Sequence, residues 1–218
     1  MASFAQVASE PEPRLDALAL ALAAEFRRVD ARAALATLDG LGAEIADAVA
    51  ECGGDPAGEA RACGRVLGAV HGFAGDRDEY DHPDNSMLDR VLERRRGLPI
   101  LLSVVYVAAA GRAGVPLEGV GLPGHFVVGH FGADPPVLLD PFAGGALLGG
   151  DVERRYVRPW AAAEIAMRML NNLVGSYQRR GHLGAAITAA RLRLDLPAEP
   201  ALRESLEAEL RRLQARLN

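Results

Sequence analysis

The chain has 218 residues, of which 50% are hydrophobic and 24% charged, and its formal net charge is −5 at pH 7. It is long enough to bury one sizeable core, and the acidic balance argues against nucleic acid as the main ligand because no basic field is available for phosphates. No apolar run of about 18 residues occurs, and the first residues lack the regions of a signal peptide, so we expect a cytoplasmic protein without a membrane span.

The two cysteines, Cys52 and Cys63, are too few for a disulfide framework or a cysteine-ligated metal cluster. Cys63 falls among the apolar positions of an expected helix and is interpreted as a buried structural thiol. Cys52 precedes a Gly-Gly turn, and no basic residue adjoins it to activate a thiolate. All 24 basic residues are arginine, so no lysine is available for a Schiff base. We therefore expect no cofactor, no metal site and no catalytic thiol.

The first third of the chain is expected to form a helical layer over residues 14–75. Residues 1–13 are small and polar, with two prolines, and are interpreted as a disordered tail. Asp30 is a candidate N-cap, Gly40 is a candidate helix stop, and Asp55 followed by a proline is a clear helix start. The expected helices cover residues 14–28, 30–38, 41–50 and 56–73.

A core domain is expected over residues 76–160, built around one apolar helix. Ser86 is a candidate N-cap for a first helix, which ends at Gly97. Pro99 then begins a second helix, which is apolar on every face up to Ala113. Such a helix is typical of a fully buried position.

Three extended segments follow the apolar helix. They are expected at residues 117–122, 126–131 and 137–139, with a hairpin connection between the last two. His125 enters the second segment, and Asp140 follows the third. Because these two ends lie side by side in an antiparallel pair, we expect the imidazole and the carboxylate within hydrogen-bonding reach.

The last part of the chain, residues 161–218, is expected to be helical again. The expected helices cover residues 161–180, 182–194 and 199–217. A set of apolar and small residues echoes one tetratricopeptide unit: Asn171, Leu173, Tyr177, Gly181, Ala185 and Ala186. One unit is fewer than the roughly three that a stable array requires, so we interpret this tail as a docked helical hairpin.

Five short motifs occur in order along the central part of the chain. They are Tyr80-x-x-Pro83-x-Asn85-Ser86, Arg96-Gly97-Leu98-Pro99-Ile100, Leu102-Ser103, Pro123-Gly124-His125-Phe126 and Asp140-Pro141-Phe142. Together they resemble the SirB family of the transglutaminase-like superfamily. The resemblance covers residues 80–148 well and the flanking helices, including the tetratricopeptide-like tail, loosely. It implies an α+β fold with a papain-like core, in which a buried helix packs on an antiparallel sheet between N-terminal and C-terminal helices.

The same resemblance implies where a catalytic site would lie. Transglutaminase-like enzymes carry a nucleophilic cysteine at the start of the buried helix, and the resemblance places Pro99 at that position. His125 and Asp140 match the histidine and the aspartate of the family. Proline has no side-chain heteroatom and cannot attack a substrate, so the retained His125 and Asp140 are expected to form a residual dyad.

Four further motif residues are candidates for binding a ligand. They are Asn85, Ser86, Arg96 and Ser103. Ser103 is also the nearest hydroxyl to the lost nucleophile position, but it lies one helical turn deeper, where a serine hydroxyl more often bonds the preceding turn.

These observations leave more than one function open. The favoured hypothesis is a non-catalytic transglutaminase-like protein that acts as an interaction or regulatory module, whose partner is a protein or a small molecule. The alternative is an enzyme of changed chemistry, in which His125 oriented by Asp140 acts as general acid or base on a small molecule. A third and least favoured hypothesis brings Cys52 or Cys63 into the site from the N-terminal layer.

Overall fold

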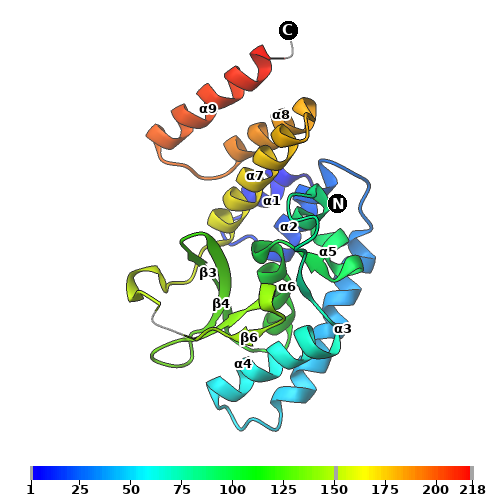
Figure 1. Cartoon of the computed structure of the whole chain (residues 1–218), viewed down its shortest axis with the longest axis vertical. Coiled ribbons are helices and arrows are strands. Elements are labelled where there is room, and N and C mark those ends of the chain that lie inside the picture. Colours follow the sequence, from blue (N-terminus) through cyan, green and yellow to red (C-terminus); the bar gives the residue numbers. More distant parts are fainter. Residues whose placement is uncertain (1, 150–151, 217–218) are drawn as a thin grey trace.

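The structure is a computed structural model that describes residues 2–149 and 152–216 (Figure 1). Its helices are α1 (Phe4–Ala8), α2 (Leu15–Ala24), α3 (Ala31–Val49), α4 (Pro56–Gly64), α5 (Leu88–Arg94), α6 (Pro99–Arg112), α7 (Ala162–Arg179), α8 (Leu183–Leu192) and α9 (Pro200–Ala215). Its strands are β1 (Ala74–Gly75), β2 (Arg96–Gly97), β3 (Leu117–Leu122), β4 (His125–His130), β5 (Val137–Asp140) and β6 (Ala146–Leu147). The α+β fold class predicted from the sequence is confirmed.

Helix α6 is the centre of the molecule. It begins at Pro99, whose fixed backbone angle suits the first helical position. The residue before it, Leu98, has an extended backbone. Figure 1 shows α6 between the sheet on one side and α2, α3 and α5 on the other, and it contacts all of these elements. Because neighbours surround it, nearly every residue from Pro99 to Tyr106 is buried. The predicted burial of this apolar helix is confirmed.

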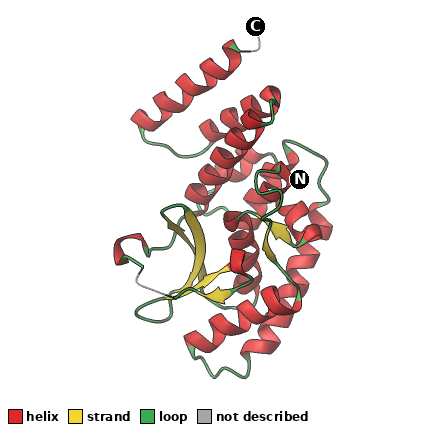
Figure 2. Ribbon diagram, viewed as in Figure 1, coloured by secondary structure: helices red, strands yellow, loops and turns green. Residues whose placement is uncertain are grey.

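The main sheet is antiparallel, with the strand order β3-β4-β5-β6. Strand β4 pairs with β3 over its whole length, from Leu122 opposite His125 to Leu117 opposite His130. Because successive side chains point to opposite faces, Phe126 and Val128 join the main core, whereas Val127 belongs to a smaller cluster on the other face. The short parallel pair β1 and β2 lies on the other side of α6 in Figure 2.

The N-terminus differs from the expected disordered tail. Ser3 caps the short helix α1, with its hydroxyl accepting from the Gln6 N–H and the Gln6 side chain accepting from the Ser3 N–H. Phe4 is fully buried against the core, and Val7 is 5% exposed. This segment is ordered because one capping box and two buried apolar side chains are enough to dock a five-residue helix.

Two expected helix signals in the sequence are overridden by packing. Helix α3 runs straight through Gly40, because the buried face formed by Leu38, Leu41 and Ile45 offsets the cost of about 1 kcal/mol for an interior glycine. Ser86 does not cap a helix, since it ends a 3₁₀ turn and α5 begins at Leu88 without a side-chain cap.

The fourth N-terminal helix starts at Asp55 as expected, but it changes its winding. After Gly64 it continues as a π-helical segment, Arg65–Val70, and ends before Phe73. The loop after β5 approaches this segment very closely, because a Cβ atom at Gly68 would lie 1.7 Å from the carbonyl oxygen of Gly144. The glycines of this helix therefore let the loop that follows Asp140 pack directly on its backbone.

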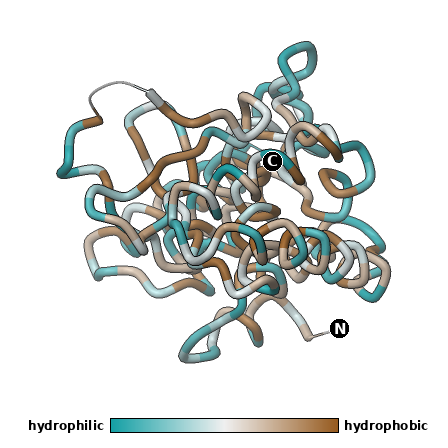
Figure 3. Tube along the Cα trace, turned by 90° about the horizontal axis from the view of Figure 1, so that it is seen from below, coloured by the Kyte–Doolittle hydropathy of each residue, from teal (hydrophilic) through white to brown (hydrophobic). Residues whose placement is uncertain are grey.

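The C-terminal helices α7, α8 and α9 form an antiparallel stack, with α9 at the end remote from the sheet (Figure 1). Helix α7 buries Leu170, Leu173 and Tyr177 toward the body of the molecule. Figure 3 shows hydrophobic segments gathered in the middle and hydrophilic segments at the rim. Among the helices of the described ranges, none combines the length and hydrophobicity that a bilayer crossing requires.

Candidate functional site

His125 and Asp140 meet at one end of the sheet. His125 is the first residue of β4 and Asp140 is the last residue of β5, and these strands are antiparallel neighbours. The Nε2 atom of His125 lies 3.0 Å from Oδ2 of Asp140, and the two side chains are 29% and 16% exposed. The predicted contact between the imidazole and the carboxylate is confirmed.

The carboxylate of Asp140 is fixed by its own backbone. Its Oδ1 atom accepts from the N–H of Phe142 at 2.9 Å and from the N–H of Ala143 at 3.3 Å, because Asp140 is the N-cap of a short 3₁₀ turn. This leaves Oδ2 for His125. The carboxylate can therefore hold the Nε2 side of the imidazole, while Nδ1 makes no hydrogen bond to any residue that the structure describes.

An aromatic side chain lies beside the His125 ring, and an arginine binds the His125 backbone. The edge of the Phe142 ring meets the imidazole with a centroid distance of 6.4 Å, and Tyr80 meets Phe142 at 6.0 Å. The backbone of His125 is held by Arg168 of α7, whose Nη2 donates to the His125 carbonyl at 2.9 Å. The site is thus built from the 80–86 loop, the β4–β5 edge and α7.

Pro99 is buried at the first position of α6. Its carbonyl accepts from the Ser103 hydroxyl at 2.9 Å. Pro99, Ser103 and Tyr106 lie on one face of the helix, since they are separated by four and three residues. The Tyr106 hydroxyl reaches the turn that follows Asp140, because a Cβ atom at Gly145 would lie 2.6 Å from it, and burial is the main cause that raises the pKa of Tyr106. The start of α6 therefore contributes no nucleophile to the site.

Ser103, Asn85 and Arg96 do not form the expected ligand set. Ser103 is 1% exposed and its hydroxyl is bonded back to Pro99, which is the ordinary behaviour of a helical serine. The amide nitrogen of Asn85 donates to the Glu79 carbonyl at 2.8 Å, and Asn85 is fully buried. The exposed Arg96 donates to the Gly72 carbonyl at 2.6 Å. In the structure these three side chains make contacts within the protein, and their role in binding a ligand stays a prediction.

Arg94 is the arginine of the 94–96 triplet that turns inward. Its Nη1 donates to Oδ1 of Asn85 at 2.9 Å, and its Nη2 donates to Asp76 at 2.9 Å. The N–H of Glu79 is the largest of the interactions that lower the pKa of Asp76, and Asn85 and Arg94 add to it. This network holds the 76–86 loop against α5. Its polar side chains bond to one another and to the loop backbone.

Ser86 is the member of the expected ligand set that reaches a cavity. It is 1% exposed and lines a cavity of about 60 Å³ together with Tyr80, Leu98 and Ser176. The cavity lies between the 80–86 loop, the start of α6 and the face of α7. Its volume is enough for one or two small groups such as water molecules.

The two cysteines lie away from any thiolate-activating environment. Cys63 is fully buried, and burial is the main reason that its pKa is raised to about 12. Cys52 donates weakly to the Ala48 carbonyl at 3.7 Å. Within residues 2–149 and 152–216, no group of His, Cys, Asp and Glu side chains has the arrangement of a metal site. The hypothesis that either thiol enters the site has no structural support.

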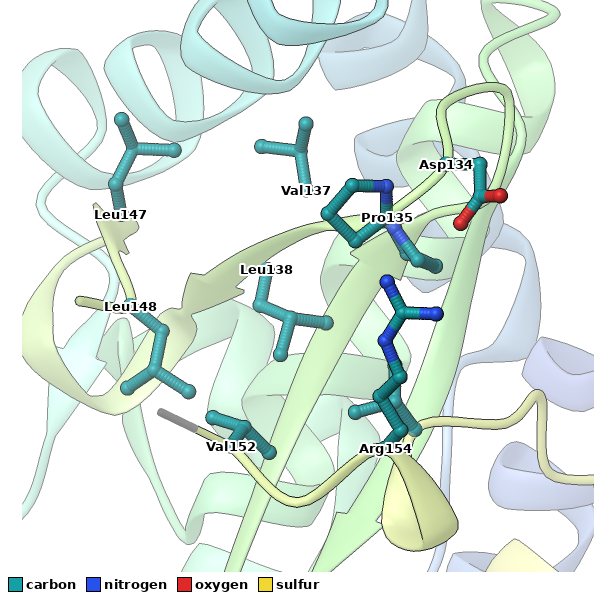
Figure 4. Close-up of a pocket in the computed structure, with 10 residues that line it drawn as sticks. Asp134, Pro135, Val137, Leu138, Leu147, Leu148, Val152 and Arg154 are labelled. Atoms are coloured by element: carbon teal, nitrogen blue, oxygen red, sulfur yellow. The ribbon is translucent and has the colours of Figure 1, made fainter. Parts of the chain in front are cut away.

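A cavity of about 720 Å³ lies apart from the dyad. It sits against β5, between the 134–137 hairpin loop and side chains of residues 147–148 and 152–157 (Figure 4). Figure 4 shows mostly aliphatic side chains around it, including Leu138 and Leu148, with Asp134 and Arg154 at the rim. None of the four best-formed cavities in the described part of the chain is lined by His125 or Asp140.

Arg168 is the site residue that sequence reasoning missed. It lies 43 residues from His125 in the chain and in a helix of ordinary amphipathic pattern. No local signal marks it, since its position depends on how α7 docks on the end of β4. The contact of Trp160 with Arg168 depends on the same docking.

The chain was compared with known protein families, curated proteins and solved structures. It is 43% identical to a UPF0162 protein of Xylella fastidiosa over 104 residues, which cover 48% of this chain and 37% of that protein. It is 31% identical to a UPF0162 protein of Pseudomonas aeruginosa over 139 residues, which cover 57% of this chain and 51% of that protein. It is also 31% identical to mouse F-box only protein 21 over 126 residues, which cover 50% of this chain and 20% of that protein.

The chain therefore spans only part of the length of these relatives. No solved structure matches it at a significant level. The family model that matches is described as the transglutaminase-like superfamily, and the match covers residues 32–173. These residues include the 80–86 loop, α6, β4, β5 and the first two thirds of α7, so the model contains the whole His125–Asp140 site. The match takes in well over half of the chain, and the chain belongs to the transglutaminase-like superfamily.

Proposed function

We propose that this chain is a non-catalytic transglutaminase-like module, similar to SirB proteins, that binds a partner at the His125–Asp140 end of the sheet. One observation carries the proposal. The imidazole lies beside Asp140 as it would in an active site, while Pro99, which the resemblance aligns with the position of the nucleophile, is a buried proline at the start of α6. An oriented imidazole can form hydrogen bonds, but without a nucleophile it cannot carry out acyl transfer through a covalent intermediate.

The chemistry of the surroundings supports the same proposal. Acyl transfer by a thiol needs a cysteine whose pKa is lowered, whereas the pKa of Cys63 is raised to about 12. The hydroxyl of Ser103 is bonded to Pro99 and is buried, so it cannot replace the thiol. A partner that covers the half-exposed ring of His125 would find a hydrogen-bonding atom, Nδ1, beside the aromatic surface of Phe142 and Tyr80.

The comparisons support a module. Related segments occupy 20%, 37% and 51% of three longer relatives, so the same domain occurs in chains of different lengths. One of these relatives is named as an F-box protein, whereas the others are named only as UPF0162 proteins. In this chain the tetratricopeptide-like helices α7 to α9 would serve as a docking surface beside the site.

A second candidate function is favoured by the free ring nitrogen. Because Asp140 holds Nε2, the unbonded and partly exposed Nδ1 of His125 could accept a proton from a bound small molecule. In this alternative His125 acts as general base, oriented by Asp140, without a covalent intermediate.

Turnover that depends on His125 separates the two functions. We would measure hydrolysis of small activated esters and thioesters by the parent, by His125→Ala and Asp140→Asn, and by His71→Ala as a control variant of another partly exposed histidine beside a carboxylate. The proposal predicts that all four proteins have the same rates. Loss of turnover in His125→Ala and Asp140→Asn alone, with melting temperatures near that of the parent, would establish the enzyme and refute the module.

A further inference from the structure

Arg168 differs from the other arginines that are withdrawn from solvent. In the two described ranges, six arginines are buried or half-buried. Five of them have a carboxylate partner within 3.1 Å: Arg27 with Asp89, Arg90 with Asp84, Arg94 with Asp76, Arg112 with Asp16, and Arg193 with Glu209. Arg168 has no such partner among these residues. It is therefore a half-buried cation without a counter-charge, at the edge of the candidate site.

The contacts of Arg168 use only part of its guanidinium. Its Nη2 donates to the His125 carbonyl at 2.9 Å, and the group lies over the rings of Phe126 at 5.3 Å and Trp160 at 5.7 Å. Burial lowers the pKa of Arg168, and the phenol of Tyr80 is the titratable neighbour that opposes this shift. The physical cause of the lowered pKa is thus the removal of water without a neighbouring carboxylate.

A purely structural role does not use the remaining donors. The stacking on aromatic rings contributes about 0.5–2 kcal/mol, and it involves the face of the guanidinium and not its edge. Nε and Nη1 donate to none of the described residues, and they are not among the buried polar atoms that lack a partner, so they keep contact with solvent. An arginine presents its N–H groups as a planar fork, which suits a carboxylate or a phosphate.

The surroundings of this fork are positive and aromatic. Tyr80, 48% exposed, packs on Phe142, and Arg77 lies over the same Phe142 ring at 5.8 Å. Two acidic groups of this end already have partners, because Asp140 binds His125 and backbone N–H groups, and Asp81 binds Arg179. These two acids therefore leave the charge of Arg168 without compensation.

We propose that Arg168 anchors an oxyanion-binding site beside His125, which takes a carboxylate or phosphate group carried by the partner of this module. The inference rests on the proposed function for the place at which a partner binds, and it adds the chemical group that the partner must present. Carboxylates and phosphates share the two adjacent oxygen acceptors that the free edge of Arg168 can bind.

The single tryptophan of the chain offers a direct probe. The guanidinium groups of two arginines lie over the ring of Trp160, that of Arg158 at 5.5 Å and that of Arg168 at 5.7 Å from the ring centroid. Arg158 is exposed and already paired with Glu164, so Arg158→Gln is a matched control for Arg168→Gln. Tryptophan fluorescence would be followed while inorganic phosphate, and separately benzoate, is added at constant ionic strength.

The proposal predicts a saturable fluorescence change in the parent and in Arg158→Gln, with binding at least about tenfold weaker in Arg168→Gln, because a charge-assisted pair is lost. Saturation by phosphate alone indicates a phosphate group, and saturation by benzoate alone indicates a carboxylate; either result supports the site. A parent that does not saturate with either anion overturns the proposal, as does equal saturation in Arg168→Gln.

Two further variants keep the test decisive. If Arg168→Gln does not fold, Arg168→Lys keeps the charge but loses the fork, and the proposal then predicts weaker binding than in the parent. His71→Gln, at a histidine that pairs with Glu44 of α3, is predicted to keep the saturable change, because the anion pairs with Arg168. Turnover that depends on His125 would refute the proposed function and leave anion binding at Arg168 unchanged, whereas loss of anion binding would refute only the site at Arg168.

Discussion

Strand β4 carries a histidine–carboxylate pair at each of its ends, and the two pairs differ in one important respect. At the far end, Nε2 of His130 lies 2.8 Å from Oε2 of Glu59, and Nδ1 accepts from the Gly132 N–H at 3.1 Å. His130 is 2% exposed, and both of its ring nitrogens are used. At the near end, His125 is 29% exposed, and only Nε2 is used.

The difference shows that a histidine beside a carboxylate does not by itself identify a functional site. His130 joins α4 to the sheet, and because its Nδ1 accepts a hydrogen bond from the Gly132 N–H, its Nε2 carries the hydrogen that it donates to Glu59. His125 has the same partner type but keeps a free nitrogen at the surface of the molecule. The free nitrogen, and not the ion pair, is the property that makes His125 a candidate for binding or proton transfer.

The largest effect is expected for the buried pair. His130→Ala leaves the carboxylate of Glu59 and the N–H of Gly132 without partners and opens a cavity, so we expect a loss of about 2–4 kcal/mol in the free energy of unfolding. His125→Ala removes a partly exposed contact between an imidazole and a carboxylate and should cost about 1 kcal/mol or less. Urea unfolding of both variants measures the difference. Equal losses would mean that the two pairs have the same role.

Asp140→Ala is expected to have an intermediate effect. It leaves the N–H groups of Phe142 and Ala143 without their shared acceptor, and we expect a loss of about 1–2 kcal/mol in the free energy of unfolding. Asp140→Asn keeps an acceptor for these N–H groups and should be close to the parent. If thermal or urea unfolding shows that both variants are equally unstable, the carboxylate stabilises the site mainly through His125 and not through the backbone.

The network at Asp76 predicts a smaller effect that depends on pH. The N–H of Glu79, with Asn85 and Arg94, lowers the pKa of Asp76 in the folded protein. A lowered folded-state pKa contributes stability above the ordinary pKa of aspartate, near 4, and this contribution is lost as the pH falls through the folded-state value. Asp76→Asn should therefore be less stable than the parent at neutral pH, and the difference should shrink in acid. Urea unfolding at several pH values checks this, and a constant difference would contradict it.

Much of the fold follows from local patterns in the sequence. The buried helix from Pro99, the strands of the main sheet and the meeting of His125 with Asp140 all depend on periodicity and strand register, which neighbouring residues determine. The helical start at Asp55 follows in the same way from its cap.

The positions that local patterns do not reveal are those at which distant segments decide the outcome. Gly68 permits the close approach of the Gly144 backbone, which no local sequence pattern predicts. Arg94 turns inward because it donates hydrogen bonds to Asn85 and Asp76. The position of Arg168 beside His125 depends on the docking of α7. The residual dyad was thus accessible from the sequence, whereas the cation beside it was not.

The central claim is that Pro99 occupies the position of a lost nucleophile beside an intact dyad. It is tested most directly by Pro99→Cys in a background where Cys52 and Cys63 are replaced by serine and alanine. The ultraviolet absorbance of the thiolate, followed between about pH 4 and pH 9, gives the pKa of the new cysteine. We predict a thiol pKa well below the ordinary value of about 8.5, and a return toward that value when His125→Ala is added. An ordinary thiol pKa in both folded proteins would contradict the account, because Pro99 would then not lie at the position that the dyad serves.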